Sequence, residues 1–343
     1  MGNKGGTTLE AGAERVPGDE ARAAAETRDV GDLRTDQPLP RQTLHKTALE
    51  QIFVTDWMLG PGDDWCTIAA RLPLAHGHFS DTAAQYHDIV LMSEVVRQAG
   101  LVVAEEWIKV PDDRQFLLRE LKVELDPIEH ARRTRETCDV LISQDPSSQV
   151  KMRPGRSMAG GMMRSRIQIG GRPAGMSEVM GAWVPNDFYD GFRGSKGEET
   201  SGEGLPEPSP RADVETRTGK VNPANSVITP LRPSGEPRGY EASLVIERSD
   251  PTFFDHPLDH VPGLLLLEGI QQVAVAGACE QLGMDHSRVV VSSFHMAFSK
   301  LAEFQPDVVC SVVLDEDGSG GKVACSQGGK VCCEGTVRIA HVG

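Results

Sequence analysis

Two segments of the chain repeat one pattern of apolar and polar residues. Residues 93–104 (SEVVRQAGLVVA) align without a gap on residues 267–278 (LEGIQQVAVAGA). Three pairs of polar residues match in this alignment: Glu94 with Glu268, Arg97 with Gln271, and Gln98 with Gln272. A stretch rich in His and Asp precedes each segment, and about four β-rich segments follow it. A repeat of this kind predicts two copies of one structural unit.

Each copy predicts a long buried helix. Residues 261–282 are apolar nearly all round, which is typical of a helix enclosed by the protein, and Pro262 suits the first turn. The matching helix is expected over residues 88–108. A long buried helix lying across an antiparallel sheet is an α+β arrangement. We therefore expect two such units packed as a pseudo-dimer, with the helices side by side and each cradled by its own sheet.

Composition divides the chain into four parts. Residues 1–40 hold almost no large apolar side chains, which predicts a disordered N-terminal tail. Residues 41–193 form the first repeat, with a lead-in over 44–59 and strands expected near 65–74, 115–125, 136–143, 162–169 and 176–184. Residues 194–218 are acidic and rich in Gly and Pro, which indicates a linker. Residues 219–343 form the second repeat, with strands expected near 240–247, 289–299, 308–314, 321–326 and 331–341.

Charge and cysteine content narrow the class of protein. The net charge of −15 argues against general nucleic-acid binding, which needs a basic surface. No apolar run approaches the roughly 20 residues that span a bilayer, and the N-terminus lacks the order of a secretory signal. The seven cysteines show no CxxC spacing, so reduced thiols in a cytoplasmic protein are expected. No metal-binding pattern is visible.

Two buried carboxylates are the leading catalytic candidates. Glu268 and Glu94 each lie inside an apolar helix, where an ionised carboxylate is costly without a partner. Burial would raise the pKa of both groups and suit them to act as bases. The structural alternative is that Glu268 caps or pairs with a neighbouring strand. His256 and His260 titrate near neutrality and are candidate proton shuttles.

Other polar residues are candidates for substrate binding. The N–H groups near Gly263 open a helix and suit an oxyanion or phosphate. Arg97 is the cation of the helix motif and suits a forked grip on phosphate, although it would also pair with Glu94 three residues earlier. His76, His78 and His87 lie in a turn-rich stretch and are predicted to be surface or capping residues. The basic stretch 151–172 is either a dock for an acidic carrier protein or a solvated β-hairpin.

The motif residues resemble a known family. DHPLDHVPGLLLLEG, SEVVRQAG, VPDDRQFLL, LHKTALEQIFVTDW and AFSKLAEFQPDV are similar to segments of the A-factor biosynthesis (AfsA-like) family of γ-butyrolactone synthases, whose fold is a double hotdog. PGLLLLEGIQQ is also similar to the helix motif of hotdog dehydratases, in which a Glu works with a His from the preceding turn. The resemblance covers about residues 44–342.

The resemblance implies a reaction. The family joins a β-ketoacyl thioester, carried by coenzyme A or an acyl carrier protein, to dihydroxyacetone phosphate, and an aldol condensation then gives a phosphorylated butenolide. No further cofactor is implied. Arg97, Gln271, Gln272, Asp259 and Gly263 would then bind substrate. The chain departs from the family at Gln271, where an Arg is usual. A dehydratase, hydratase or thioesterase activity and a non-catalytic acyl-binding module are the alternatives.

Overall fold

The computed structural model of the protein describes residues 29–60, 65–111, 113–145, 149–152, 159–194 and 209–343. None of the helices among these residues is both long and apolar enough to cross a membrane. The expected disorder of residues 1–28 and most of the expected linker, residues 195–208, lie outside the described residues.

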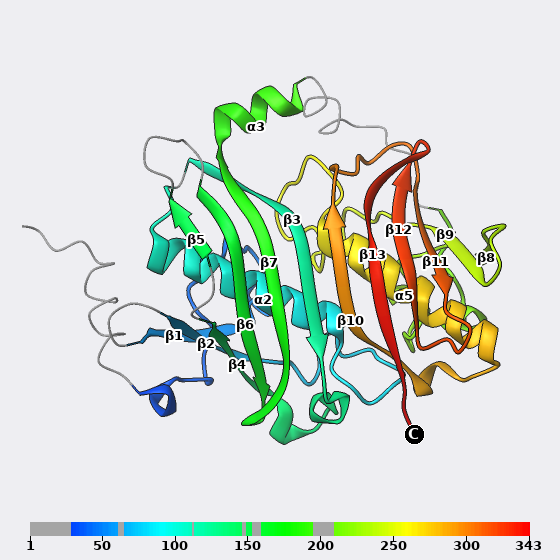
Figure 1. Ribbon diagram of the computed structural model, residues 1–343, viewed down its shortest axis with the longest axis horizontal. Coiled ribbons are helices and arrows are strands. Elements are labelled where there is room, and N and C mark those ends of the chain that lie inside the picture. Colours follow the sequence, from blue (N-terminus) through cyan, green and yellow to red (C-terminus); the bar gives the residue numbers. More distant parts are fainter. Residues whose placement is uncertain (1–28, 61–64, 112, 146–148, 153–158, 195–208) are drawn as a thin grey trace, which may run out of the picture.

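One antiparallel sheet of 13 strands runs through both repeats (Figure 1). The first repeat contributes β1 (Val54–Leu59), β2 (Cys66–Arg71), β3 (Arg114–Leu125), β4 (Asp139–Gln144), β5 (Gln149–Met152), β6 (Ala159–Ile169) and β7 (Arg172–Pro185). The second contributes β8 (Arg232–Pro233), β9 (Gly239–Ser243), β10 (Val289–Phe298), β11 (Val308–Leu314), β12 (Gly320–Gln327) and β13 (Lys330–His341). The strands expected from the sequence are present, and β1, β5 and β8 are additional.

The two halves of the sheet join where β3 pairs with β10, from Ser293 opposite Glu124 to Ala297 opposite Glu120. The expectation of a separate sheet for each helix is therefore wrong. The reason is that β3 and β10 each have an edge whose backbone groups need partners, and pairing them satisfies both edges. The basic stretch 151–172 lies partly in the β6–β7 hairpin, where Arg164 pairs with Glu178; residues 153–158 lie outside the described residues.

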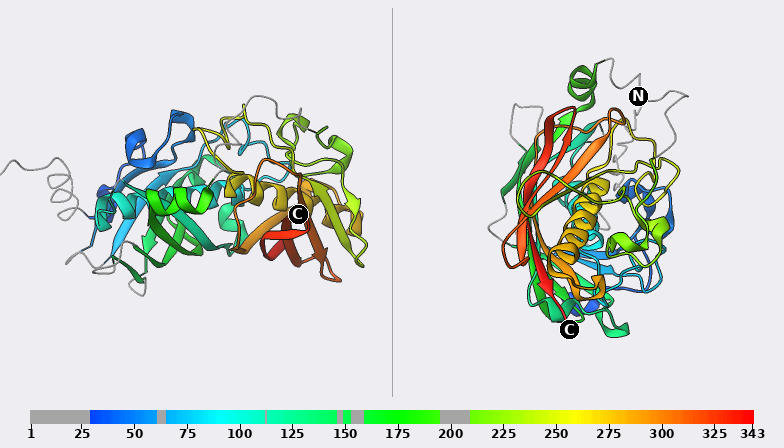
Figure 2. Two further views of the ribbon diagram at one scale, coloured as in Figure 1. Left: turned by 90° about the horizontal axis from the view of Figure 1, so that it is seen from above. Right: turned by 90° about the vertical axis from the view of Figure 1, so that its right-hand side faces the viewer.

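The two long helices lie on one face of this sheet (Figures 1 and 2). Helix α2 (Ile89–Val102) is capped by Asp88, whose carboxylate accepts the Val90 N–H at 2.7 Å, and one π-helical segment (Val103–Ile108) extends it. Helix α5 (Gly263–Leu282) ends at Gly283, whose positive φ of 64° is the usual helix stop. Both are buried on nearly all sides, as their apolar sequences predict.

The short helices lie in the connections. Helix α3 (Asn186–Arg193), which follows β7, was not expected from the sequence. Single 3-10 turns occupy Val30–Asp32, Arg41–Leu44, Leu49–Gln51, Ile128–Ala131, Arg135–Thr137, Val214–Thr216, Pro223–Asn225 and His286–Arg288.

The structure moves two boundaries that the sequence predicted, the end of the N-terminal tail and the end of the linker. Residues 29–40 are not a free tail, because the Leu39 N–H donates to the Val54 carbonyl and the Arg34 N–H donates to Asp56. The end of the expected linker is also packed, since Ala212 is buried and its N–H donates to the Ile228 carbonyl. Backbone pairing with β1 and with the second repeat fixes these polar segments, which composition alone does not reveal.

Two aspartates connect the repeats reciprocally. Asp255, just ahead of α5, accepts the backbone N–H of Ala48 in the first repeat at 2.7 Å. Asp81, just ahead of α2, accepts the backbone N–H of Asn222 in the second repeat at 3.0 Å. The two aspartates are 174 residues apart, as are Ala48 and Asn222 and the two aligned helix segments. The repeats thus exchange equivalent contacts, as subunits of a two-fold dimer do.

Candidate functional site

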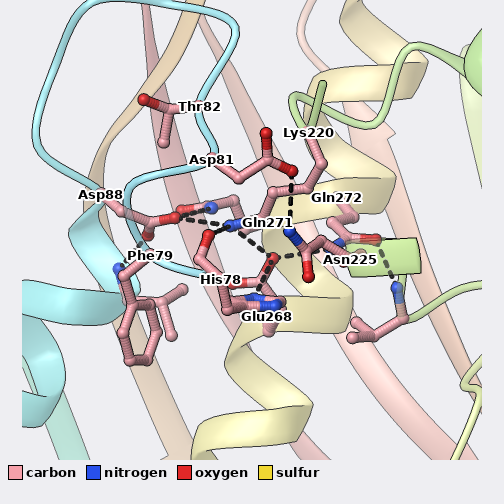
Figure 3. A network of polar contacts seen from close by, with 12 residues as sticks. His78, Phe79, Asp81, Thr82, Asp88, Lys220, Asn225, Glu268, Gln271 and Gln272 are labelled. Atoms are coloured by element: carbon pink, nitrogen blue, oxygen red, sulfur yellow. Dashed lines mark hydrogen bonds and ion pairs between the residues drawn. The ribbon is translucent and has the colours of Figure 1, made fainter. Parts of the chain in front are cut away.

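The first polar cluster surrounds Glu268 on α5, and we call it the Glu268 cluster (Figure 3). The Gln272 side chain donates to Glu268 Oε1 at 2.7 Å. Lys220 Nζ lies 3.2 Å from the same oxygen and 2.8 Å from the Asp88 carboxylate. His78 Nε2 lies 3.3 Å from Glu268 Oε1. His78 and Asp88 come from the first repeat, so this cluster is built across the pseudo-dimer interface.

The second cluster surrounds Glu94 on α2, and we call it the Glu94 cluster. Arg97 donates to both carboxylate oxygens, at 2.7 and 2.8 Å, and Gln98 donates at 2.9 Å. Lys46 Nζ lies 3.3 Å from Glu94 and 4.0 Å from Asp255, which belongs to the second repeat. Lys46 and Lys220 are again 174 residues apart. The two clusters are therefore equivalent, with Arg97 present in one and Gln271 in its place in the other.

A chain of polar contacts joins the clusters. Gln98 Nε2 donates to the Gln51 carbonyl at 2.7 Å as well as to Glu94. Gln51 Nε2 lies 3.2 Å from His76 Nε2, two residues before His78. Gln51 and His76 thus connect the two clusters, since His76 Nδ1 accepts the His78 backbone N–H.

The prediction of raised pKa values for the two glutamates is wrong. Burial alone would raise the pKa of Glu94, but Arg97 and Lys46 outweigh it and hold that pKa at about 2. Burial likewise opposes the charge on Glu268, and Lys220 and His78 hold its pKa at about 2. Each glutamate is therefore an anion that positions cations, and neither is an effective base near neutral pH.

The ion pairs of the buried glutamates predict that the folded protein loses stability in acid. The pKa of Glu94 is lower in the folded chain than its ordinary value of 4.5, so its contribution is present above that value and is lost as pH falls towards 2. We expect the free energy of unfolding to fall by roughly 3 kcal/mol for this carboxylate alone. Urea denaturation at a series of pH values checks this. A free energy of unfolding that is constant from neutral pH to about pH 3 would contradict it.

His78 is the functional candidate that the sequence did not single out. It was predicted to be a surface or capping residue, yet it is buried against Glu268 and between the rings of Phe79 and Phe253. Within the described part of the chain, its Nδ1 and the Oε2 atom of Glu268 have no hydrogen-bond partner. His76 does cap, since its Nδ1 accepts the backbone N–H groups of residues 78 and 79, whereas His87 is buried.

The structure separates the two predicted histidines from Glu268. His256 has a side chain that is 44% exposed and lies on the Glu94 side, 4.0 Å from Asp255. Burial first, and then the positive charges of Lys46, Arg97 and His45, lower the pKa of His256. These three cations contribute a positive potential at His256, which Asp255 partly offsets.

His260 and Asp259 belong to a third group, next to α3. His260 Nδ1 lies 2.6 Å from the Asp259 carboxylate, which also accepts from Arg193 at 2.7 Å. Arg193 in turn binds Glu303 at 2.8 Å, and Tyr189 donates to Asp259 at 3.1 Å. Asp259 is thus occupied with holding α3 against the second repeat. No sequence pattern indicated this contact, because α3 itself was not expected.

The remaining substrate-binding candidates have structural partners. The Gln272 amide donates to the Asn225 carbonyl and accepts the Val227 N–H, so it holds the segment ahead of β8. Gln271 donates to Asp88 at 3.1 Å. Gly263 is the first residue of α5, where the next N–H groups, of residues 265 and 266, already donate to the Pro262 carbonyl.

Extending the repeat alignment would have found the lysines. Lys46 and Lys220 stand at one position relative to Glu94 and Glu268, in segments that look unlike each other. Asp88 offered no comparable signal, because Pro262 occupies its position in the other copy.

Comparison with known sequences shows which family the chain belongs to. It matches the A-factor biosynthesis hotdog domain twice, over residues 28–184 and over residues 207–343. The chain belongs to this family. The fold is accordingly two tandem hotdog units packed as a pseudo-dimer.

Two curated relatives of this A-factor biosynthesis hotdog protein share one name. A 2-oxo-3-(phosphooxy)propyl 3-oxoalkanoate synthase of Streptomyces virginiae is 28% identical, over 77% of this chain and 83% of the relative. The synthase of that name from Streptomyces griseus is 30% identical, over 70% of this chain and 76% of the relative. Among solved structures, an acyl-ACP thioesterase from Bacteroides thetaiotaomicron has a TM-score of 0.46 at 15% identity, covering 81% of this chain and 98% of the thioesterase.

Proposed function

We propose that this chain is an acyltransferase that joins a 3-oxoacyl thioester to the hydroxyl group of dihydroxyacetone phosphate. The name of the relatives describes the resulting ester, 2-oxo-3-(phosphooxy)propyl 3-oxoalkanoate. Ester formation breaks the thioester C–S bond, forms a C–O bond and moves the hydroxyl proton to the departing sulfur. It involves no change of oxidation state. Intramolecular aldol condensation of the ester would then give a butenolide phosphate.

The proposal rests on how Arg97 is held and on how much of its side chain is exposed. Its guanidinium is held from one side by both oxygens of Glu94, while 39% of the side chain remains exposed. A guanidinium fixed in this way presents its remaining N–H groups as a fork, the geometry that phosphate recognition uses. The half-exposed His256 stands in the same positive potential. We assign the phosphate of the acceptor substrate to this place.

The acid–base step is assigned to His78. Its imidazole lies against Glu268, which would hold the ring in position and stabilise the imidazolium that forms when a hydroxyl proton is taken up. Since the pKa of Glu268 is held at about 2, this carboxylate stays ionised and serves as the positioning partner. The protonated ring would then return the proton to the departing thiolate.

The product test is direct. The purified chain is incubated with dihydroxyacetone phosphate and a 3-oxoacyl thioester of coenzyme A, pantetheine or an acyl carrier protein, and mass spectrometry follows the products. The proposal expects the phosphorylated ester or its butenolide, dependent on both substrates. Release of free 3-oxo acid at the same rate with and without the phosphate would instead indicate a thioesterase.

A hydratase or dehydratase is the second candidate, because His78 of one repeat faces a carboxylate on the helix of the other. That activity would convert a 3-hydroxyacyl thioester to the enoyl thioester and ignore dihydroxyacetone phosphate. A change in the absorbance of the enoyl thioester distinguishes this activity from ester formation. A protein that binds acyl groups without catalysis would leave all of these substrates unchanged.

Replacing Arg97 tests the phosphate assignment. Arg97→Gln should raise the KM for dihydroxyacetone phosphate by about tenfold to a hundredfold, since each lost charge-assisted hydrogen bond is worth roughly 1.5–3 kcal/mol. The KM for the thioester should change little. Steady-state kinetics with each substrate varied in turn measures both. Arg166→Gln removes a surface arginine of β6 that pairs with Asp145, and it should change neither constant.

A further inference from the structure

A cavity of about 40 Å³ lies beside the Glu268 cluster, between α5, the start of β10 and the loop ahead of α2. Gln271, Asp88 and His87 form part of its polar wall, and Val275 and Val289–Val291 form much of its apolar wall. Among the described residues that line it, none is a lysine or an arginine. By volume it holds a few non-hydrogen atoms.

The pseudo-two-fold relation gives this cavity a counterpart on the Glu94 side. Most positions of the cavity wall carry different residues there, related by the same spacing of 174 residues. Four of them are more acidic or less basic on the cavity side. They are Gln271 against Arg97, Asp88 against Pro262, Tyr86 against His260, and Thr82 against His256. Each exchange removes a neutral or acidic side chain and supplies a neutral or basic one. The exchange of His87 for Val261 runs in the opposite direction. The difference in formal charge comes from Asp88 and Arg97, which make the Glu94 side the more positive one.

The cavity side disfavours an anion. The Asp88 carboxylate stands in its wall, and the nearby cation, Lys220, is buried and already bonded to Asp88 and Glu268. Burial alone would lower the pKa of Lys220, but those two carboxylates raise it, so this charge stays in the pair. Bringing a phosphate dianion next to Asp88 without a free cation would be strongly unfavourable.

The same wall suits an uncharged acyl group. Valines offer apolar contact, which contributes roughly 25 cal/mol for each Å² taken out of water. The side-chain amide of Gln271 donates one N–H to Asp88 and has a second N–H that can donate to a ketone or thioester oxygen. A guanidinium in this position would match a dianion better than a neutral carbonyl group.

On the counterpart side the carboxylates are engaged. Asp255 accepts the N–H groups of Thr47 and Ala48, and Asp259 is bound by Arg193. The Arg97 side chain there remains 39% exposed.

We propose that the two equivalent sides of the pseudo-dimer bind different substrates: the cavity beside Gln271 receives a few atoms of the neutral 3-oxoacyl group, and the Arg97 side alone receives the phosphate. The inference rests on the proposed function. It assigns one phosphate site to each chain instead of two, and it makes Val275 a determinant of acyl chain length.

The test measures the binding of each substrate separately, without turnover. The probes are dihydroxyacetone phosphate and a series of non-reactive 3-oxoacyl pantetheine thioethers of graded length, followed by titration calorimetry. Val275→Phe should weaken thioether binding at least about tenfold by filling the cavity, while phosphate binding stays within about twofold. Val275→Ala should shift the preferred chain to a longer one, and it covers the possibility that the phenylalanine variant does not fold.

Leu101→Phe is the matched control, because Leu101 stands at the equivalent position on α2. It should leave the chain-length preference unchanged. A phosphate stoichiometry of one, abolished by Arg97→Gln, supports the inference. Two phosphates per chain, or Val275 variants that leave thioether binding unchanged, would overturn it. If the native chain binds neither probe, the proposed function fails together with the inference, whereas binding of both probes without a response to Val275 defeats the inference alone.

Discussion

Replacing His78 with glutamine should lower the rate of ester formation by at least about a hundredfold, because the side chain would no longer take up and return a proton. Glutamine still fills part of the space and can donate to Glu268, so the fold should persist. Stopped assays with both substrates at saturation measure the loss as a change in kcat. The pH dependence of any residual rate should also lose the limb that the imidazole supplies.

Glu268→Gln should also lower the rate of ester formation by a large factor, but for a different reason. The carboxylate positions His78 and does not itself remove the proton, so the substitution takes away the orientation and the stabilisation of the imidazolium. Thr252→Val is the matched control for His78→Gln, since Thr252 stands at the position equivalent to His78 and is buried. An unchanged kcat in His78→Gln, with normal thermal unfolding, would assign His78 to packing.

Lys220→Met should be the most destabilising single change among the charged residues of the two clusters. Lys220 has a side chain that is 1% exposed, and it neutralises both Asp88 and Glu268. Removing one partner of a buried pair leaves uncompensated charge and typically costs about 3–5 kcal/mol. Urea denaturation measures the change in the free energy of unfolding. The variant should recover stability in mild acid, where the stranded carboxylates take up protons.

Lys46→Met is the matched control for this prediction. Lys46 has the equivalent position, but its partner Glu94 also binds Arg97 through both oxygens. The loss of stability should therefore be clearly smaller than for Lys220→Met. Equal losses in the two variants would show that Arg97 does not compensate Glu94, and that the two clusters do not differ in the way their charges are balanced.

The two central helices and their glutamates could be predicted from the amino-acid sequence. The gapless match of residues 93–104 on 267–278 required two copies of one unit, and apolar residues on all sides of α2 and α5 required burial. The motif residues were similar to one family, to which the chain belongs. These features are local in the sequence, since helical periodicity and repeat spacing are properties of consecutive residues.

The partners of those glutamates depend on the tertiary structure. Burial of Glu268 suggested a raised pKa, yet Lys220 and His78, which come from distant segments, lower it. His260 and Asp259 are only a few residues ahead of Glu268, but they turn towards Arg193 on the unexpected helix α3. Charge interactions act through space and depend on which segments the fold brings within a few ångströms. No pattern of neighbouring residues in one copy encodes that choice, because each cluster draws residues from the other copy.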